Sequence, residues 1–201
     1  MTCFKRPECI DPIGRRRLAH MALAAAASGI VAISWRQSSA QNTPGHGDLA
    51  AKFTVHAQPR PVPPFAFTDK DATALTLGAF AGKLVLINFW ATWCAPCVEE
   101  MPSLDRLQVK LRGEGLVVLP LSVDGPTRKK VAPFYESRKL SALGIYFDDK
   151  RAAFASFDVG VLPTSILIGR DGREIGRVEG QADWDSPPSV AFLRRYLSAA
   201  G

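Results

Sequence analysis

Two cysteines separated by two residues carry the strongest chemical signal in the sequence. Cys94 and Cys97 flank Ala95-Pro96, directly after the apolar run 84–90 and at the start of a stretch with helical spacing. A cysteine at a helix N-terminus faces unpaired N–H groups and the positive end of the helix dipole, which favour the thiolate. The two-residue gap also allows both sulfurs to reach bonding distance. We therefore expect a redox-active pair, with Cys94 as the exposed nucleophile and Cys97 as the more buried resolving thiol.

Half of a zinc site and an inert structural bridge are the alternatives for this pair. Zinc needs two further ligands, yet no cysteine follows Cys97 and no histidine follows His56. A bridge between residues this close in the chain closes too small a loop to stabilise a fold much by chain entropy. The pair is therefore predicted to perform chemistry, and no metal or other cofactor is expected.

Glu100 is the candidate for handling protons near these thiols. It lies three residues beyond Cys97, one helical turn along the same face. Next to an apolar strand, its carboxyl should be partly desolvated and have a pKa above the ~4.3 of free Glu. Such a pKa suits proton transfer. The alternative is a solvated helix carboxylate, which is also what we expect of Glu99, about 100° away around the helix.

The first 40 residues have the pattern of an export signal. Arg15–Arg17 precede an uncharged run over 18–35, and Ser38-Ser39-Ala40 offers small residues at the −3 and −1 positions of a cleavage site. The arginines also resemble a twin-arginine signal. The run approaches the ~20 residues that span a bilayer, so a retained membrane anchor stays open, as does a buried Ala-rich helix. With a signal or an anchor, the arginines stay in the cytoplasm and the rest of the chain is exported.

Composition and charge exclude several classes of protein. The chain has 201 residues, of which 47% are hydrophobic and 22% charged, so it is neither disordered, collagen-like nor disulfide-dense. Its net charge of +6 falls to +2 over residues 41–201, which argues against nucleic-acid binding. Cys3 and Cys9 lie in the leader, so the exported part would hold one cysteine pair. In an oxidising compartment that pair forms a disulfide unless something reduces it.

Beyond the leader, the pattern predicts one α/β domain over residues 59–201, preceded by a polar spacer over 41–58. Apolar runs and helical spacing alternate along the domain. Asp171-Gly172 is a hairpin signal between its last two strands. We expect a central mixed sheet flanked by helices, with a parallel core, a C-terminal β-hairpin and a closing helix. The predicted strands cover 84–90, 116–123, 145–147, 164–169 and 174–179, and the predicted helices cover 97–112, 127–139, 151–157 and 189–199.

The stretch Asn88-Phe89-Trp90-Ala91-Thr92-Trp93-Cys94-Ala95-Pro96-Cys97, followed by Glu99-Glu100-Met101-Pro102, resembles the thioredoxin superfamily. It is most similar to the exported TlpA/ResA-like branch. The resemblance extends from about Pro64 to the C-terminus, and its further matches are Gly82-Lys83, Val161-Leu162-Pro163-Thr164 and Asp183-Trp184. It implies a thioredoxin-like fold.

The resemblance also assigns roles to single residues. It implies that Pro163 is a cis-proline facing the disulfide and that Leu162 offers its backbone to substrate. Together with Trp93, these are the expected substrate-binding residues. Pro102 resembles a helix-kinking proline of the branch. Thioredoxins place a buried Asp where this chain has Asn88, whereas TlpA/ResA-like proteins tune the thiols with a Glu at the position of Glu100.

The function implied is that of an extracytoplasmic, periplasmic thiol:disulfide oxidoreductase that reduces protein disulfides. Typical substrates of the branch are the haem-attachment cysteines of apocytochromes c, in cytochrome c biogenesis, or copper-site cysteines. A membrane electron-transfer protein would return the pair to the dithiol, and the chain would touch the membrane only through its N-terminal segment. The uncharged Ala95-Pro96 favours a potential nearer thioredoxin's ~−270 mV than the ~−120 mV of a strong oxidant.

Three other functions are possible on related folds. A disulfide-forming oxidant is the first of them. A copper-binding chaperone is the second, but such chaperones space their cysteines more widely and add a distant histidine, whereas no histidine follows His56. A thiol peroxidase is disfavoured because its reactive cysteine sits in a Pro-Thr-Cys setting.

Overall fold

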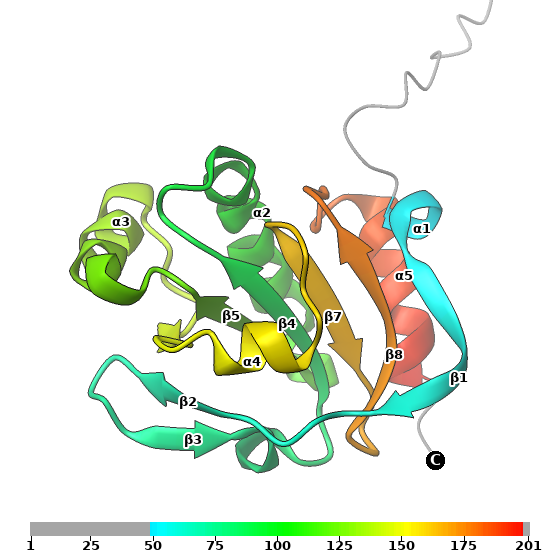
Figure 1. Ribbon diagram of the computed structural model, residues 1–201. Helices are drawn as coiled ribbons and strands as arrows, with labels where there is room; N and C mark the ends of the chain where they lie inside the picture. The colour runs from blue at the N-terminus through cyan, green and yellow to red at the C-terminus, as the bar shows by residue number, and fades with distance from the viewer. Residues whose placement is uncertain (1–48, 199–201) are drawn as a thin grey trace, which may run out of the picture. The chain divides into compact units, whose positions relative to one another are not determined.

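The computed structural model describes residues 49–198 (Figure 1). The predicted export signal over 1–40 and the first part of the predicted spacer, residues 41–48, lie outside this range. Among the described residues, none of the helices has the length and hydropathy that a membrane crossing requires.

One mixed sheet forms the centre of the fold, with the strand order β1-β8-β7-β4-β5-β6-β2-β3. β4, β5 and β6 run parallel to one another, and the other neighbouring strands pair antiparallel. This arrangement confirms the predicted mixed α/β fold with a C-terminal hairpin. The strands are β1 (Thr54–Pro61), β2 (Ala66–Asp69), β3 (Ala74–Thr76), β4 (Leu84–Trp90), β5 (Leu116–Ser122), β6 (Tyr146–Phe147), β7 (Thr164–Ile168) and β8 (Arg173–Glu179).

Helices cover the two faces of this sheet. In the view of Figure 1, α4 lies in front of the sheet, and α2 and α5 lie behind it. Short 3₁₀ helices at 77–80, 112–114 and 125–130 complete the connections. The α-helices are α1 (Leu49–Lys52), α2 (Ala95–Leu111), α3 (Val131–Arg138), α4 (Ala152–Ser156) and α5 (Pro187–Ser198).

The part of the core that positions the cysteines lies between α2 and the central strands. All seven residues of β4 are buried, as its continuous apolar run predicts for a strand covered on both faces. The apolar stripe predicted for α2 is also buried, because positions three and four apart share one helix face. Its members are Met101, Leu104, Leu107 and Leu111, each 0% exposed. β4 and α2 are therefore held rigidly, and so is the turn between them.

The prediction of a spacer over 41–58 is wrong for residues 49–58. They form α1 and most of β1, and β1 pairs antiparallel with β8 through Thr54 opposite Arg177 and Val55 opposite Gly176. Nearly every side chain of β1 is exposed, so the strand shows no alternation of apolar and polar residues. Its prolines, Pro59 and Pro61, are tolerated because β1 is an edge strand.

Two further regions differ from the expectation. β2 and β3 form a short hairpin that was not predicted, closed by a turn in which Asp69 accepts backbone N–H bonds from Asp71 and Thr73. Strands of four and three residues are too short to show a period of two. The predicted helix at 127–139 is a 3₁₀ helix over 125–130 followed by α3.

Candidate active site

The redox pair lies where β4 passes into α2. After β4 the chain turns, and the Cys94 N–H donates to the Ala91 carbonyl at 3.1 Å. Cys94 is the N-cap residue of α2, and its carbonyl accepts the Val98 N–H at 3.0 Å. Cys94 and Cys97 are joined by a disulfide, with their Cα atoms 5.3 Å apart. The structure therefore places the predicted pair at the predicted strand-to-helix junction.

The two sulfur-bearing residues differ in their access to solvent. Cys94 is 7% exposed and Cys97 is 0% exposed, whereas Ala95 and Pro96 between them are exposed. A thiolate must touch the disulfide it attacks, and of the two residues Cys94 has the greater access to solvent. Its position at the helix N-terminus also favours the thiolate form once the bond is reduced.

A buried carboxylate at the end of the neighbouring strand holds the turn before Cys94. Asp124 follows β5 and accepts the Thr92 N–H at 3.0 Å and the Thr92 hydroxyl at 2.5 Å. It also accepts the Ser122 hydroxyl at 2.8 Å. Asp124 is not among the residues predicted for the site. The carboxyl ends of parallel strands meet at one edge of a sheet, so an Asp after β5 could have been placed beside the end of β4.

Pro163 lies at the same edge of the sheet. The Leu162–Pro163 peptide bond is cis, as the resemblance implied. β7 begins at Thr164 and runs antiparallel to its neighbour β4. Thr164 pairs with Phe89 near the end of β4. This register brings Pro163 to the end of the sheet from which Cys94 emerges.

Exposed apolar side chains mark the surface beside the pair. Trp93 is 58% exposed and Val161 is 45% exposed. One precedes Cys94 and the other precedes the Leu162–Pro163 bond. Leu162 is half-buried and Pro163 is buried. The residues predicted to bind substrate thus come from two segments far apart in sequence, which meet at the same end of the sheet.

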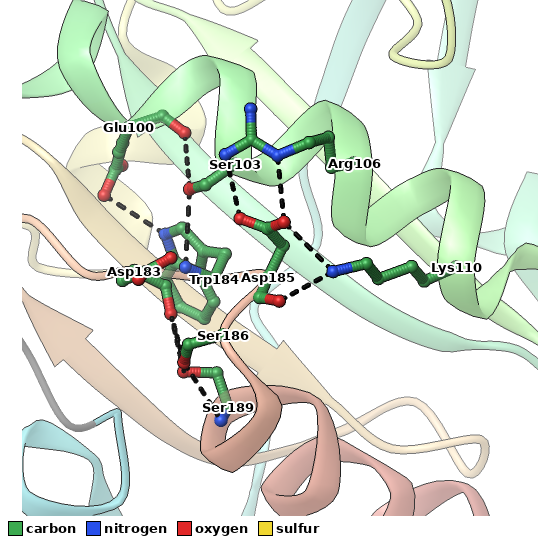
Figure 2. A network of polar contacts seen from close by, with 9 residues as sticks. All are labelled: Glu100, Ser103, Arg106, Lys110, Asp183, Trp184, Asp185, Ser186 and Ser189. Carbon is green, nitrogen blue, oxygen red and sulfur yellow. Dashed lines mark hydrogen bonds and ion pairs between the residues drawn. The ribbon is translucent and has the colours of Figure 1, made fainter. Parts of the chain in front are cut away.

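Glu100 is buried inside the fold, with only 1% of the residue exposed. Its Oε1 accepts the Asn88 amide at 2.7 Å. Its Oε2 accepts the Ala182 N–H and the Trp184 indole N–H, both at 3.1 Å, and Figure 2 shows the indole bond. Glu99 is exposed, as predicted. The neighbouring carboxylates of α2 therefore occupy opposite environments.

Burial raises the pKa of Glu100 to about 7, the direction expected from the sequence. The N–H groups of Ala182, Asn88 and Trp184 act against burial, because each stabilises the ionised carboxylate, and the charge of Lys52 acts in the same direction. Burial has the larger effect. At neutral pH this carboxyl is therefore poised between its two forms, one helical turn from Cys97.

Asn88 occupies the place where thioredoxins have a buried Asp, and it acts here as a hydrogen-bond donor. Its amide N–H₂ group also donates to the Ser165 hydroxyl at 2.9 Å. Its Oδ1 has no hydrogen-bond partner among residues 49–198. A flipped amide could therefore accept a proton held by Glu100, so Asn88 is compatible with either form of that carboxyl.

The donors that reach Glu100 from far along the chain are not predicted from the sequence. Ala182 and Trp184 lie more than 80 residues further along the chain, and Ala182 contributes only its backbone. No spacing rule connects such positions. Asp183-Trp184 was noticed only as part of a resemblance, which gave Trp184 no role.

Comparisons with known proteins agree with this geometry. The model of the AhpC/TSA family matches residues 59–173, more than half of the chain. The thiol-disulfide oxidoreductase ResA of a Bacillus cereus strain is 34% identical over 119 residues, which are 59% of this chain and 68% of the relative. ResA of Bacillus subtilis (strain 168) is 30% identical over 118 residues, 59% of this chain and 65% of the relative.

Solved structures share the architecture. A putative thiol:disulfide interchange protein DsbE from Chlorobium tepidum superposes with a TM-score of 0.59 at 26% identity, covering 73% of this chain and 99% of its own. A putative thiol-disulfide oxidoreductase from Bacteroides vulgatus gives a TM-score of 0.57 at 28% identity, covering 72% and 97%. A thioredoxin domain from the same species, at 20% identity and a TM-score of 0.60, supports the fold. The chain has a thioredoxin-like fold, belongs to the AhpC/TSA family and is a ResA-like thiol-disulfide oxidoreductase.

Proposed function

We propose that the enzyme reduces disulfides of other proteins, with Cys94 as the nucleophile. The difference in exposure between Cys94 and Cys97 carries this proposal. In the dithiol form, the Cys94 thiolate attacks one sulfur of a substrate disulfide. A mixed disulfide forms between Cys94 and that sulfur, and the other substrate sulfur leaves as a thiolate that takes up a proton.

Cys97 resolves the mixed disulfide with help from Glu100. Cys97 must lose its proton before its sulfur can attack the Cys94 sulfur, and it is fully buried, away from bulk water. The ionised Glu100 carboxylate, one helical turn away, accepts that proton. The substrate sulfur that was bound to Cys94 then leaves as a thiolate, and the enzyme is left with the Cys94–Cys97 disulfide. Two electrons have passed from the enzyme to the substrate.

A membrane electron-transfer protein returns the pair to the dithiol. Without such a donor the oxidised enzyme would stop after one turnover, because the exported part of the chain would hold no other cysteine. Cys94, the more accessible of the two cysteines, would serve this exchange as well. The partners proposed are therefore protein disulfides and a membrane donor.

Trp93, Leu162 and Pro163 are proposed to bind the substrate chain. Trp93, directly before Cys94, and Val161, directly before Leu162, both offer exposed apolar surface. The half-buried Leu162 can offer its backbone to an extended peptide. Recognition through backbone and apolar contacts suits an unfolded or loosely folded protein that presents a cysteine pair.

We further propose that the enzyme works outside the cytoplasm, in the periplasm or its equivalent. The Arg15–Arg17 cluster and the uncharged run over 18–35 support export through a signal or an anchor. The haem-attachment cysteines of apocytochromes c and copper-site cysteines are the proposed substrate class, by resemblance to the TlpA/ResA-like branch.

The midpoint potential of the Cys94/Cys97 pair in the purified protein tests the reductive direction. The uncharged Ala95-Pro96 adds no partner for a thiolate, so we expect a value nearer ~−270 mV than ~−120 mV. Equilibrated with glutathione buffers, the pair should be largely oxidised. A pair that is mostly dithiol in those buffers would identify a disulfide-forming oxidant instead.

A further inference from the structure

The segment 182–185, here called the capping segment, covers the Glu100 carboxyl at Oε2, whereas Asn88 of β4 contacts it at Oε1. Besides its two N–H bonds to the Glu100 carboxyl, it donates the Trp184 backbone N–H to the Ser103 hydroxyl oxygen at 3.3 Å. The Ser103 hydroxyl in turn donates to the Glu100 carbonyl at 2.8 Å. Figure 2 shows the contacts among Glu100, Ser103 and Trp184.

Asp185 ends the capping segment and ties it to α2 through two cations. Arg106 donates to both Asp185 carboxylate oxygens at 2.9 Å. Lys110 donates to Oδ2 at 3.0 Å and to the Asp185 carbonyl at 2.7 Å. Ser103, Arg106 and Lys110 follow one another along one face of α2 (Figure 2). We call Asp185, Arg106 and Lys110 the Asp185 cluster.

A cavity of about 420 Å³ lies between α2 and the start of the capping segment. Glu100 lines it together with Glu99, Arg106 and Asp183, so these charges face the same space, while Lys52 acts on Glu100 from α1. The Glu100 side chain is nevertheless almost fully covered. If the capping segment moved away from α2, water in this cavity would reach the carboxyl.

We propose that Asp185 is a positioning residue, which holds the capping segment closed over Glu100 by pairing with Arg106 and Lys110. The proposal rests on the role given to Glu100 in the proposed function and adds the group that keeps Glu100 in its environment. Ser186 and Ser189 bond to the Asp183 carbonyl and tie the segment to α5, whereas the Asp185 cluster ties it to α2.

The direction of the effect follows from what burial does to a carboxyl. Burial is the largest influence on Glu100, so water admitted by an open segment lowers its pKa towards the ordinary value. Loss of one hydrogen-bond donor to Glu100, with the capping segment still closed, raises the pKa of Glu100 instead. Trp184→Phe keeps an aromatic cover but removes the indole N–H, so it should raise the pKa of Glu100. Variants of Asp185 and Trp184 therefore shift the same titration in opposite directions.

The test is a titration of Glu100 by carbon NMR of ¹³C-glutamate-labelled, oxidised protein, with hydrogen exchange of the Trp184 indole N–H measured alongside. In Asp185→Asn we expect the titration midpoint of Glu100 to shift to lower pH and the Trp184 indole N–H to exchange about tenfold faster. Ion pairs with exposed cations contribute little to the free energy of folding, so losing this pair should open the capping segment without unfolding the protein. Glu114→Gln is the matched control. It removes the exposed Glu114–Arg194 pair, which binds Arg194 of α5 and does not touch the capping segment.

A salt titration of the unmodified protein keeps the proposal falsifiable even where a variant fails to fold. Arg106 and Lys110 are 57% and 44% exposed, so raising salt from 0.1 M to 1 M, which shortens the screening length from about 10 Å to about 3 Å, should accelerate indole exchange. Neither experiment needs a substrate, so failure of the reductase proposal would leave this result standing. The proposal for Asp185 would be overturned if the Trp184 indole exchange and the Glu100 midpoint were unchanged both in Asp185→Asn and at 1 M salt.

Discussion

Glu100 and Glu174 are both buried carboxylates, 1% and 3% exposed, and their neighbours give them opposite pKa shifts. Glu100 is bonded to neutral N–H groups, and burial raises its pKa to about 7. Burial acts in the same direction on Glu174, but Arg177 and His56 outweigh it and lower its pKa. Arg177 donates to both Glu174 oxygens at 2.8 and 3.0 Å, and the His56 ring lies 2.7 Å away.

The difference shows how one fold separates a titratable carboxyl from a structural one. Burial alone makes an acid weaker, and only a nearby cation reverses this. Glu174 has such a cation and stays ionised, so it ties β8 to β1 through His56. Glu100 has only neutral donors in contact, so it can release and accept a proton near pH 7 beside the thiols.

The largest expected effect is on the pH dependence of stability. The Glu100 pKa is about 7 in the fold and near 4.5 in the unfolded chain, so its contribution is fully present below pH 4.5 and lost as pH rises through about 7. The loss amounts to about 3 kcal/mol. Urea unfolding at pH 4.5 to 8 should show this decline, and Glu100→Gln should remove it.

Glu174→Gln provides the contrast in the same experiment. Its lowered pKa gives stability that is present above the unfolded pKa and lost as pH falls through the folded pKa. The variant should therefore keep the decline between pH 4.5 and 8. Parallel curves for the unmodified protein and Glu100→Gln over that range would show that Glu100 is not protonated in the fold.

The next effect concerns the rate at which the mixed disulfide is resolved. Removal of a positioned proton acceptor typically costs about 10²-fold, and we expect a slowdown of that order for Glu100→Gln at pH 7. Asn88 can flip its unpartnered Oδ1 towards the new amide, so the fold should stay intact. Rapid-quench analysis of a preformed mixed disulfide measures this step. A normal resolution rate in Glu100→Gln together with a slow one in Glu174→Gln would contradict the assignment of Glu100 as the titratable carboxyl and Glu174 as the structural one.

The smallest effect concerns the structural carboxylate. Glu174→Gln leaves Arg177 and His56 without their anion inside the fold, so the free energy of unfolding should fall by about 2 kcal/mol. The resolution rate should not change. Chemical denaturation at pH 7 measures the loss, and Glu114→Gln, at an exposed ion pair, should lose less than about 1 kcal/mol. If Glu174→Gln and Glu114→Gln lost the same free energy of unfolding, the ion pairs of Glu174 would be as weak as an exposed pair.

Local sequence pattern predicts the cysteine pair and Glu100 well. The buried run of β4, the helical stripe of α2 and the spacing from Cys94 to Glu100 are all local along the chain, and the structure confirms their positions. The sequence also indicated that Glu100 and Glu99 differ. A helical face repeats every three to four residues, so a short stretch of sequence contains the whole signal.

The groups that fix the environment of each carboxyl could not be predicted in this way. Trp184 reaches Glu100 across 84 positions of sequence, and His56 reaches Glu174 across 118. His56 lies in the part of β1 that falls within the predicted spacer, because an exposed edge strand bears no apolar period. Pairing of β1 with β8 brings His56 to Glu174, and the segment between β8 and α5 brings Trp184 to Glu100. Single-sequence patterns encode neither contact.

Thiol alkylation rates against pH, for the reduced enzyme and its Glu100→Gln and Glu99→Gln variants, test the central claim most directly. A negative charge on Glu100 opposes formation of a nearby thiolate, so Glu100→Gln should lower the pKa values of the cysteines. Glu99 is exposed and lies off the Cys97 face, so Glu99→Gln should leave the profile unchanged. Identical profiles for all three proteins would contradict the account, because Glu100 would then not be coupled to the thiols.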